Sequence, residues 1–408
     1  MVYEKKRIFG LSIKLHDMRK FAIIILSLTV GIPVFCQMRG YKADFHLSEK
    51  HFCDTIDIEY KDGQVYVPVT MNGQRKWFNL DTGSSQGMVY LGASIGYWTE
   101  LGNVVSRDAN GLADTVKVVR MPDFRLGHLT VSGYVASMTA RRPVKANYDA
   151  IIGFDLFHKG ICTKIDVRHK RLILTDNRHA FDREQGYTLK YKLKWFVPYI
   201  LVSPFMRHVD EVLFDTGAKQ LYTMNKESFD RHAYKSKNVE SQVEGRAQGH
   251  LAIGVHGTEE RSEVAFLHLD RLKWDEFSFT DVRAITTQGT SRIGGSILQY
   301  GTVIINPFER RLTFAPYNGK DSVRVGNRQL GVAFTPHKGR AGVGLIFEKS
   351  AAYQAGLREG DIILKIDGRT IPTFQDFLIF RLTENQRHVF TVFSRNGKMR
   401  EVAVEAEQ

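Results

Sequence analysis

The feature that most constrains the fold of this chain is an internal repeat. The triplet Asp-Thr-Gly occurs at 81–83 within WFNLDTGSS and again at 215–217 within EVLFDTGAKQLY. Each triplet is followed by a segment that ends in isoleucine and glycine, AIIG at Gly153 and SRIG at Gly294. Seven residues after each of those glycines comes another, Gly160 and Gly301. The chain therefore contains two copies of one structural unit of about 130 residues.

Within each copy the pattern indicates short strands. Apolar and polar residues alternate in TVKVVRMPDFRLGHLTVSGYV (115–135) and in EVAFLHLDRLKWDEFSFTDV (263–282), with glycine and aspartate at the breaks. Period two is typical of half-buried strands, and helical periodicity is scarce before residue 350. The first 320 residues therefore predict a mainly β fold in two lobes, with turns at 107–111 and 248–257.

The composition is that of an ordinary folded protein. Of 408 residues, 43% are hydrophobic and 25% are charged, which excludes a disordered chain and leaves room for two or three domains. The formal net charge of +13 would suit an anionic partner. Lysine and arginine are scattered along the chain, however, so we expect no nucleic-acid partner and keep polyanion binding only as an alternative.

The N-terminus carries the pattern of an export signal. An uncharged apolar run, Phe21–Phe35, follows two basic residues and is short for a membrane span. We expect export to the periplasm or association with the envelope, with cleavage that leaves Gln37 first. A lipid anchor on Cys36, which the bulky residue before it disfavours, and an uncleaved anchor are the alternatives, and membrane contact is expected only through them. The pattern also fits translation from Met18.

Few side chains are suited to cross-linking or to metal binding. Once Cys36 is removed, Cys53 and Cys162 remain, and the sequence leaves open whether they pair or stay as separate thiols. No spacing of cysteine and histidine resembles a metal site. We therefore expect no metal and no other cofactor.

Two aspartates in equivalent positions suggest one shared site. If the two copies pack about an approximate two-fold axis, Asp81 and Asp215 become neighbours. Two adjacent carboxylates cannot both ionise cheaply, so one of them keeps a proton. Such a pair combines a base that takes a proton from water with an acid that donates to a carbonyl oxygen. The repeat therefore predicts hydrolysis without a metal or a covalent intermediate.

The residues beside the aspartates fit this role. Those expected to support the pair are Thr82, Gly83, Ser84, Thr216 and Gly217. The threonines offer a hydroxyl and a backbone N–H, and the glycines permit two turns to approach closely. The serine has Ala218 as its counterpart in the second copy, so we expect Asp81 to receive more hydrogen bonds and to carry the negative charge.

With these residues in place, the chain resembles a bacterial retropepsin-like aspartic protease whose two lobes are joined in tandem. The segment IIGFDLF at 151–157 is especially similar to that family. The resemblance implies a β-rich bilobal fold with a cleft, catalysis by Asp81 and Asp215, interlocked threonines, and cleavage of peptide bonds in a polypeptide. We expect a monomer. A member that keeps the fold and binds peptides without cutting them, as an envelope adaptor, is the alternative.

Two departures accompany this resemblance. Arg292 stands where the family has an apolar residue, directly before Ile293 and Gly294. Neither lobe shows the tyrosine-bearing flap motif in recognisable form, so the flap residues stay unassigned. We expect the region Val104–Val119 to form the covering hairpin.

After residue 320 the repeat ends, and a different pattern begins. The run GVGLIFEKSAAYQAGLREGDIILKIDGRTI (342–371) resembles a PDZ domain of the bacterial protease-associated type, with a second helix expected at 374–382. By that resemblance a C-terminal peptide would add as a strand to the segment Leu330, Gly331, Val332, Ala333 and Phe334. The alternatives are that the module only packs against the lobes or recognises an internal segment.

The expected organisation follows from these patterns. The fold class is a mainly β, bilobal aspartic-protease fold followed by a small α+β PDZ domain. We expect a leader at 1–36, a first lobe at 37–180, a second lobe at 181–320 and the PDZ domain at 326–408.

Overall fold

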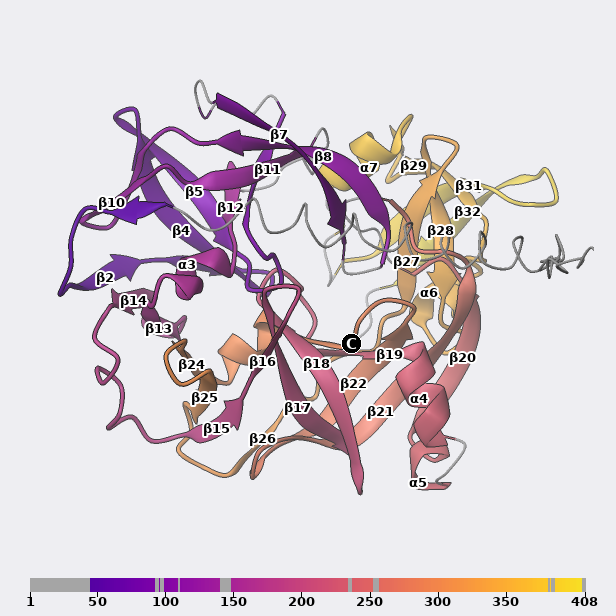
Figure 1. The fold of residues 1–408 in the computed structure, drawn as a ribbon. Coiled ribbons are helices and arrows are strands. Elements are labelled where there is room, and N and C mark those ends of the chain that lie inside the picture. The colour runs from indigo at the N-terminus through magenta and orange to yellow at the C-terminus, as the bar shows by residue number, and fades with distance from the viewer. Residues whose placement is uncertain are drawn as a thin grey trace, which may run out of the picture. The chain divides into compact units, whose positions relative to one another are not determined.

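The structure is a computed structural model that describes residues 45–91, 95, 99–108, 111–139, 148–233, 237–251, 257–380, 382 and 386–405 (Figure 1). The apolar run at 21–35, Cys36 and the expected cleavage site lie outside these residues, as do two residues of the turn predicted at 107–111. In the portion that the structure does describe, no helix has both the length and the hydrophobicity needed to cross a membrane.

The first copy forms one sheet of eleven strands. They are β1 (His46–Leu47), β3 (Glu59–Lys61), β4 (Gln64–Met71), β5 (Gln74–Leu80), β6 (Gly87–Tyr90), β7 (Thr99–Arg107), β8 (Ala113–Arg120), β9 (Phe124–Leu126), β10 (Leu129–Ser132), β11 (Val135–Thr139) and β12 (Ala150–Ile152). The path through the site region is β4-β5-β12-β6-β11-β8-β7, in which β5 and β12 are parallel.

The second copy repeats this path in a nine-stranded sheet. Its strands are β16 (Lys192–Lys194), β17 (Val197–Phe205), β18 (His208–Asp215), β19 (Tyr222–Asn225), β20 (Val243–Gly249), β21 (Ser262–Trp274), β22 (Phe277–Thr287), β23 (Arg292–Gly294) and β26 (Ser322–Arg324), with helices α4 (Lys226–Ala233) and α5 (Lys237–Glu240). The order β17-β18-β23-β19-β22-β21-β20 matches the first copy strand for strand, and β18 and β23 are again parallel. The predicted duplication of a mainly β unit is confirmed.

A third sheet joins the two copies. It contains β2 (Cys53–Asp57), β13 (Cys162–Asp166) and β14 (Arg171–Thr175) from the first copy, and β15 (Tyr187–Lys190), β24 (Gly301–Asn306) and β25 (Arg311–Pro316) from the second. Its order is β15-β25-β24-β13-β14-β2. Each copy therefore contributes three adjacent strands, arranged in the same order from the edge of the sheet to its centre. The two units meet where β13 and β24 pair in antiparallel fashion. An approximate two-fold axis therefore passes between β13 and β24.

A single apolar core runs through both copies. The alternating pattern buries every second side chain of a strand, and the fully buried rings include Phe78 on β5 and Phe214 on β18. A short helix, α3 (Asp155–His158), and a 3-10 turn, η1 (Gly295–Gln299), follow the two glycine segments of the repeat. Burial of this apolar surface is the main stabilising contribution to the strands that carry the site.

The C-terminal module is a separate small sheet with two helices. Its elements are β27 (Val332–His337), β28 (Arg340–Ile346), α6 (Ala351–Gln354), β29 (Ile362–Ile366), β30 (Arg369–Thr370), α7 (Phe374–Phe380), β31 (His388–Phe393) and β32 (Met399–Val404). The strand order β27-β28-β29-β31-β32 leaves β27 at an edge. The helix expected at 374–382 is observed to Phe380. The module has its own apolar core, which includes Leu357, Ile363 and Val392.

The two remaining cysteines do not pair. Cys53 and Cys162 both lie opposite Thr175, one on each side of β14. Two strand spacings amount to about 9–10 Å, which exceeds the Cα separation that a disulfide can bridge. Both thiols are free, and burial raises the pKa of Cys162 to about 11. The question that the sequence left open is answered in favour of separate thiols.

A buried acid, Asp155, lies just after β12. The Tyr134 hydroxyl donates to Asp155 Oδ1 at 2.8 Å, and the Gly153 N–H donates to the Tyr134 oxygen at 3.2 Å. Asp155 is 3% exposed, and burial raises its pKa from 3.8 to about 7 despite the hydrogen bonds. The folded chain therefore binds more protons than the unfolded chain between these two pKa values, so the free energy of unfolding falls as pH rises through this window.

Substituting Asp155→Asn should flatten this pH dependence. The free energy of unfolding of the wild type, measured in urea, should be lower at about pH 7.5 than at about pH 4.5. This difference should be smaller in the variant, because the titrating group is gone. An equal loss in both proteins would contradict the assignment of the titration to Asp155.

Candidate active site

The two Asp-Thr-Gly turns are locked together by their threonines. The Thr82 N–H donates to Thr216 Oγ1 at 3.1 Å, and the Thr82 hydroxyl donates to the Phe214 carbonyl at 2.7 Å. In return, the Thr216 N–H donates to Thr82 Oγ1 at 3.0 Å, and its hydroxyl donates to the Leu80 carbonyl at 2.6 Å. Both threonines are fully buried. Because each threonine follows the last residues of β5 or β18, these four bonds fix the ends of the two strands against each other.

Glycine follows each threonine because the opposite aspartate occupies the space of a side chain. A Cβ built on Gly83 would lie 2.5 Å from the carboxyl carbon of Asp215, and one on Gly217 would approach the Asp81 carboxyl at least as closely. Each glycine N–H donates to the aspartate of its own turn, at 2.9 Å for Asp81 and 3.0 Å for Asp215. The two carboxyl groups are thus brought together and are close enough to share a hydrogen bond.

The glycine that ends the AIIG or SRIG segment of each repeat packs against backbone that follows the Asp-Thr-Gly triplet. A Cβ on Gly153 would lie 2.5 Å from the backbone of Gln86, and one on Gly294 would lie 2.6 Å from the Ala218 carbonyl. The Asp81 N–H donates to the Ile152 carbonyl at 3.0 Å, which ties the first turn to β12. The repeated spacing therefore reflects a close approach of this glycine to the residues that follow each Asp-Thr-Gly triplet.

The electrostatics of the pair are asymmetric. Desolvation by the surrounding protein and the negative charge of Asp215 raise the pKa of Asp81 well above its usual value, and the N–H groups of Gly83 and Ser84 only partly oppose this. We therefore assign the shared proton to Asp81. Asp215 is 6% exposed, and its Oδ1 accepts from the N–H groups of Gly217 and Ala218 at 3.0 and 3.1 Å.

The expectation that Asp81 carries the negative charge differs from this assignment of the proton. It assumed that the Ser84 hydroxyl supports Asp81, whereas this hydroxyl donates to the Gln86 carbonyl at 2.7 Å. Alanine at 218 loses the hydroxyl and still supplies its backbone N–H to Asp215. The backbone N–H of Ala218 in the second turn therefore gives Asp215 the kind of hydrogen bond that the Ser84 hydroxyl was expected to give Asp81.

Two further residues join the lobes beside the turns. Gln64 Nε2 donates to the Gly217 carbonyl at 2.8 Å, and the Tyr60 hydroxyl donates to the Gly295 carbonyl at 3.1 Å. Burial raises the pKa of Tyr60 to about 12, so it stays a neutral donor. Sequence reasoning missed both residues, because neither belongs to a motif and each acts on the other repeat.

The region expected to form a covering hairpin is a hairpin. Strands β7 and β8 are antiparallel, with Val104 opposite Val116. In the second copy β20 and β21 form the equivalent hairpin, joined by the glycine-containing segment predicted at 248–257, of which 252–256 lie outside the described residues. A Cβ on Gly257 would lie 3.3 Å from Cδ1 of Leu112, so the loops of the two hairpins meet.

The second hairpin is attached to the C-terminal module. The His250 N–H donates to the Gly344 carbonyl at 2.8 Å, and the rings of Phe266 and Phe347 stack with centroids 4.4 Å apart. Arg261 also pairs with Glu359, with Nε and Oε1 3.0 Å apart. Val264, Phe266 and Ile285 of the lobe share a small apolar cluster with Ala333, Leu345 and Phe347 of the module.

The five residues predicted to receive a peptide differ in their surroundings. Leu330 and Ala333 pack in the cluster against the lobe, whereas Val332 and Phe334 pack on the core of the module. The Gly331 carbonyl accepts from the Phe347 N–H at 2.9 Å. In the described part of the chain, β28 is the only strand that pairs with β27, so β27 is an edge strand.

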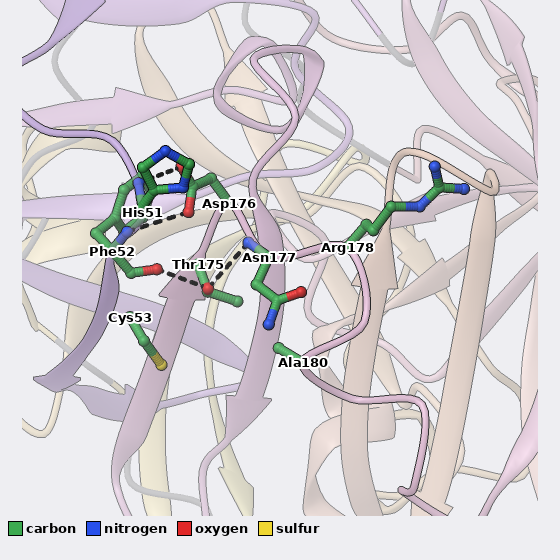
Figure 2. Close-up of a pocket in the computed structure, with 8 residues that line it drawn as sticks. All are labelled: His51, Phe52, Cys53, Thr175, Asp176, Asn177, Arg178 and Ala180. Carbon is green, nitrogen blue, oxygen red and sulfur yellow. Dashed lines mark hydrogen bonds between the residues drawn. The ribbon is translucent and has the colours of Figure 1, made fainter.

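A surface hollow of about 460 Å³ lies at the edge of the sheet that joins the copies (Figure 2). The Asp176 carboxylate accepts hydrogen bonds from the N–H groups of His51 and Phe52 at 2.7 and 3.1 Å, and these bonds fix two of the lining segments to each other. The hollow is lined by His51, Phe52, Cys53, Thr175, Asp176, Asn177, Arg178 and Ala180. None of the predicted site residues lines it.

The glycine contact can be tested without an activity assay. Gly83→Ala forces a methyl group against the Asp215 carboxyl, so denaturant unfolding should show a loss of about 1–3 kcal/mol. Ser84→Ala is the control, because it removes only the bond to Gln86 and should cost about 1 kcal/mol or less. Equal losses in the two variants would contradict the packing of the aspartate on the opposite glycine.

Comparison with protein families supports this architecture in two parts. Residues 67–156 match the family model for an aspartyl protease, and residues 329–406 match that for a PDZ domain. No curated protein gives a significant match. The second copy lies outside the protease match, and its assignment rests on the repeated topology. The chain therefore carries an aspartyl-protease segment of the retropepsin-like type followed by a C-terminal PDZ domain, as the sequence resemblance implied.

Proposed function

We propose that the protein is an aspartic endopeptidase that cleaves polypeptides with the pair Asp81 and Asp215. The observation that carries the proposal is the reciprocal threonine interlock, which holds the two carboxyl groups in contact. A pair of carboxyl groups with one shared proton is the arrangement that general acid–base hydrolysis needs. The protease family match in the first copy supports the same reaction class.

In the proposed mechanism the two aspartates have different tasks. Asp81, whose pKa is raised, holds the proton and donates it to the carbonyl oxygen of the scissile peptide bond. Asp215 takes a proton from the attacking water, so a tetrahedral diol forms and then collapses with protonation of the leaving nitrogen. The two N–H donors on Asp215 Oδ1 leave its other oxygen for the water.

We propose that the PDZ domain regulates access to this pair by holding the second hairpin. The contacts of Gly344, Phe347 and Glu359 all fall on residues 245–266 of that hairpin or its loop. A peptide added to the edge of β27 would press on Ala333, which packs in the same cluster as Phe266. Such a contact couples peptide binding in one domain to hairpin position in the other.

The place of action remains a proposal from the N-terminal sequence. An apolar run after two basic residues supports export to the periplasm or the envelope, where polypeptides are the substrate. A non-catalytic adaptor that binds peptides through both parts is the second candidate, supported by the position of β27 as an edge strand.

Substitution of either aspartate should abolish cleavage. Purified wild type should digest an unfolded polypeptide, and Asp81→Asn and Asp215→Asn should each lower kcat by roughly 10²–10⁴-fold, because the acid or the base is lost. The rate of the wild type should fall as pH rises through the raised pKa of Asp81. An adaptor would show no cleavage in the wild type, and cleavage that survives both substitutions would refute the mechanism.

A stability measurement shows whether a variant loses activity only because it unfolds. Because its folded-state pKa is raised, Asp81 lowers stability above its unfolded pKa and has no such effect below it. Asp81→Asn should therefore be more stable than the wild type at neutral pH, and the gain should vanish in acid. A destabilised variant at neutral pH would contradict a raised pKa of Asp81.

The regulatory contact has its own test. Phe347→Ala removes the stack on Phe266 and should increase hydrogen exchange in β20 while β5 and β18 stay protected. It should also change kcat/KM by roughly fivefold or more. Phe393→Ala is the matched control, because Phe393 is 44% exposed on β31. Unchanged exchange in β20 would show that the PDZ domain does not hold the hairpin.

A further inference from the structure

The hairpin of β16 and β17 ends in two exposed aromatic residues. Trp195 and Phe196 form its two-residue turn and are 65% and 53% exposed. In the described part of the chain neither ring belongs to an apolar core. Large apolar side chains at a turn tip lack the burial that usually stabilises them.

The backbone of this turn is strained for the residues that it carries. Trp195 has a φ of 52° and Phe196 a φ of 66°, so both adopt the left-handed conformation. Two-residue hairpin turns of this kind favour Asn-Gly, because bulky side chains are disfavoured at positive φ. The aromatic pair therefore does not stabilise the turn, and backbone strain of this kind often marks residues with a functional role.

Lysines line the strands that lead to the turn. In KYKLKWF, Lys190, Lys192 and Lys194 alternate with less exposed residues, and all three lysines are exposed. Lys194 forms an ion pair with Glu211. Within the described ranges neither Lys190 nor Lys192 takes part in an ion pair, so two positive charges shortly before the turn in the sequence have no ion-pair partner there.

A third aromatic residue borders the same part of the surface. Phe308 is 46% exposed and would lie 3.1 Å from a Cβ on Gly160. His158 Nε2 lies 2.9 Å from the Phe196 carbonyl oxygen, so Phe196 and Phe308 both border the turn at 158–160. The guanidinium of Arg178 lies 5.9 Å from the Phe308 ring centre and adds a cation.

We propose that this basic aromatic surface, made of Trp195, Phe196, Phe308, Lys190 and Lys192, binds an anionic phospholipid membrane. Tryptophan and phenylalanine favour the boundary between headgroups and acyl chains, and nearby lysines are attracted to anionic headgroups. Because the two rings project from a turn tip, insertion into lipid suits them better than docking on another protein. The inference is independent of catalysis by the aspartates.

The test uses the full chain with vesicles that contain brominated lipid, which quenches tryptophan on contact. Residues 1–44 contain no tryptophan, so an N-terminal tether does not generate the signal. Vesicles with phosphatidylglycerol should quench part of the wild-type fluorescence, and pure phosphatidylcholine vesicles should not. Trp195→Phe should abolish this quenching, because Trp195 is the inserted ring.

Two further variants test the charges and the turn. Lys190→Glu with Lys192→Glu should raise the vesicle concentration needed for half-maximal quenching roughly tenfold. The control Lys338→Glu with Lys349→Glu makes the same charge change elsewhere and should leave this concentration unchanged. Trp195→Asn with Phe196→Gly should lose membrane insertion and keep or raise the unfolding temperature, because it supplies the preferred turn residues.

The proposal is overturned by any of four results. These are quenching that persists in Trp195→Phe, equal quenching by neutral vesicles, equal effects of the two lysine pairs, and a lower unfolding temperature in the Asn-Gly variant. The last result would mean that the aromatic pair serves the fold.

Discussion

The reciprocal bonding of Thr82 and Thr216 is the interaction on which the rest of the site depends. Each threonine satisfies buried backbone groups of the other repeat, so neither turn can shift without leaving polar groups unpaired in the core. This rigid base lets two acids be held together in spite of their repulsion. The repulsion is relieved by a proton on Asp81, which the proposed mechanism passes to the carbonyl oxygen of the substrate.

The sequence predicted the fold and the pairing of the aspartates better than it predicted their charge. Glycine spacing and period-two alternation are local signals, and they indicated two copies of a mainly β unit, whereas the order of the strands in each sheet came from the structure. The direction of the Ser84 hydroxyl and the donation from the Ala218 N–H depend on how a turn is oriented in space. Likewise, nothing in the run LGVAF indicated that Leu330 and Ala333 face the protease lobe.

The attachment of the PDZ domain changes how its peptide-binding segment is understood. One face of the segment belongs to the domain's own core and the other to a cluster shared with β21 and β22. A domain linked by a flexible tether could bind a peptide without consequence for its neighbour. Here the Arg261–Glu359 pair and the stacked phenylalanines attach the PDZ domain directly to the second hairpin.

The sheet that joins the repeats has an evolutionary consequence. A single repeat would leave the outer edge of β13 unpaired, and two identical chains would complete the sheet by pairing through it. Once both halves are encoded in one gene, symmetry is no longer enforced, and each half can acquire mutations of its own. Serine against alanine after the two Asp-Thr-Gly turns, and isoleucine against arginine at 151 and 292, are differences that such freedom permits.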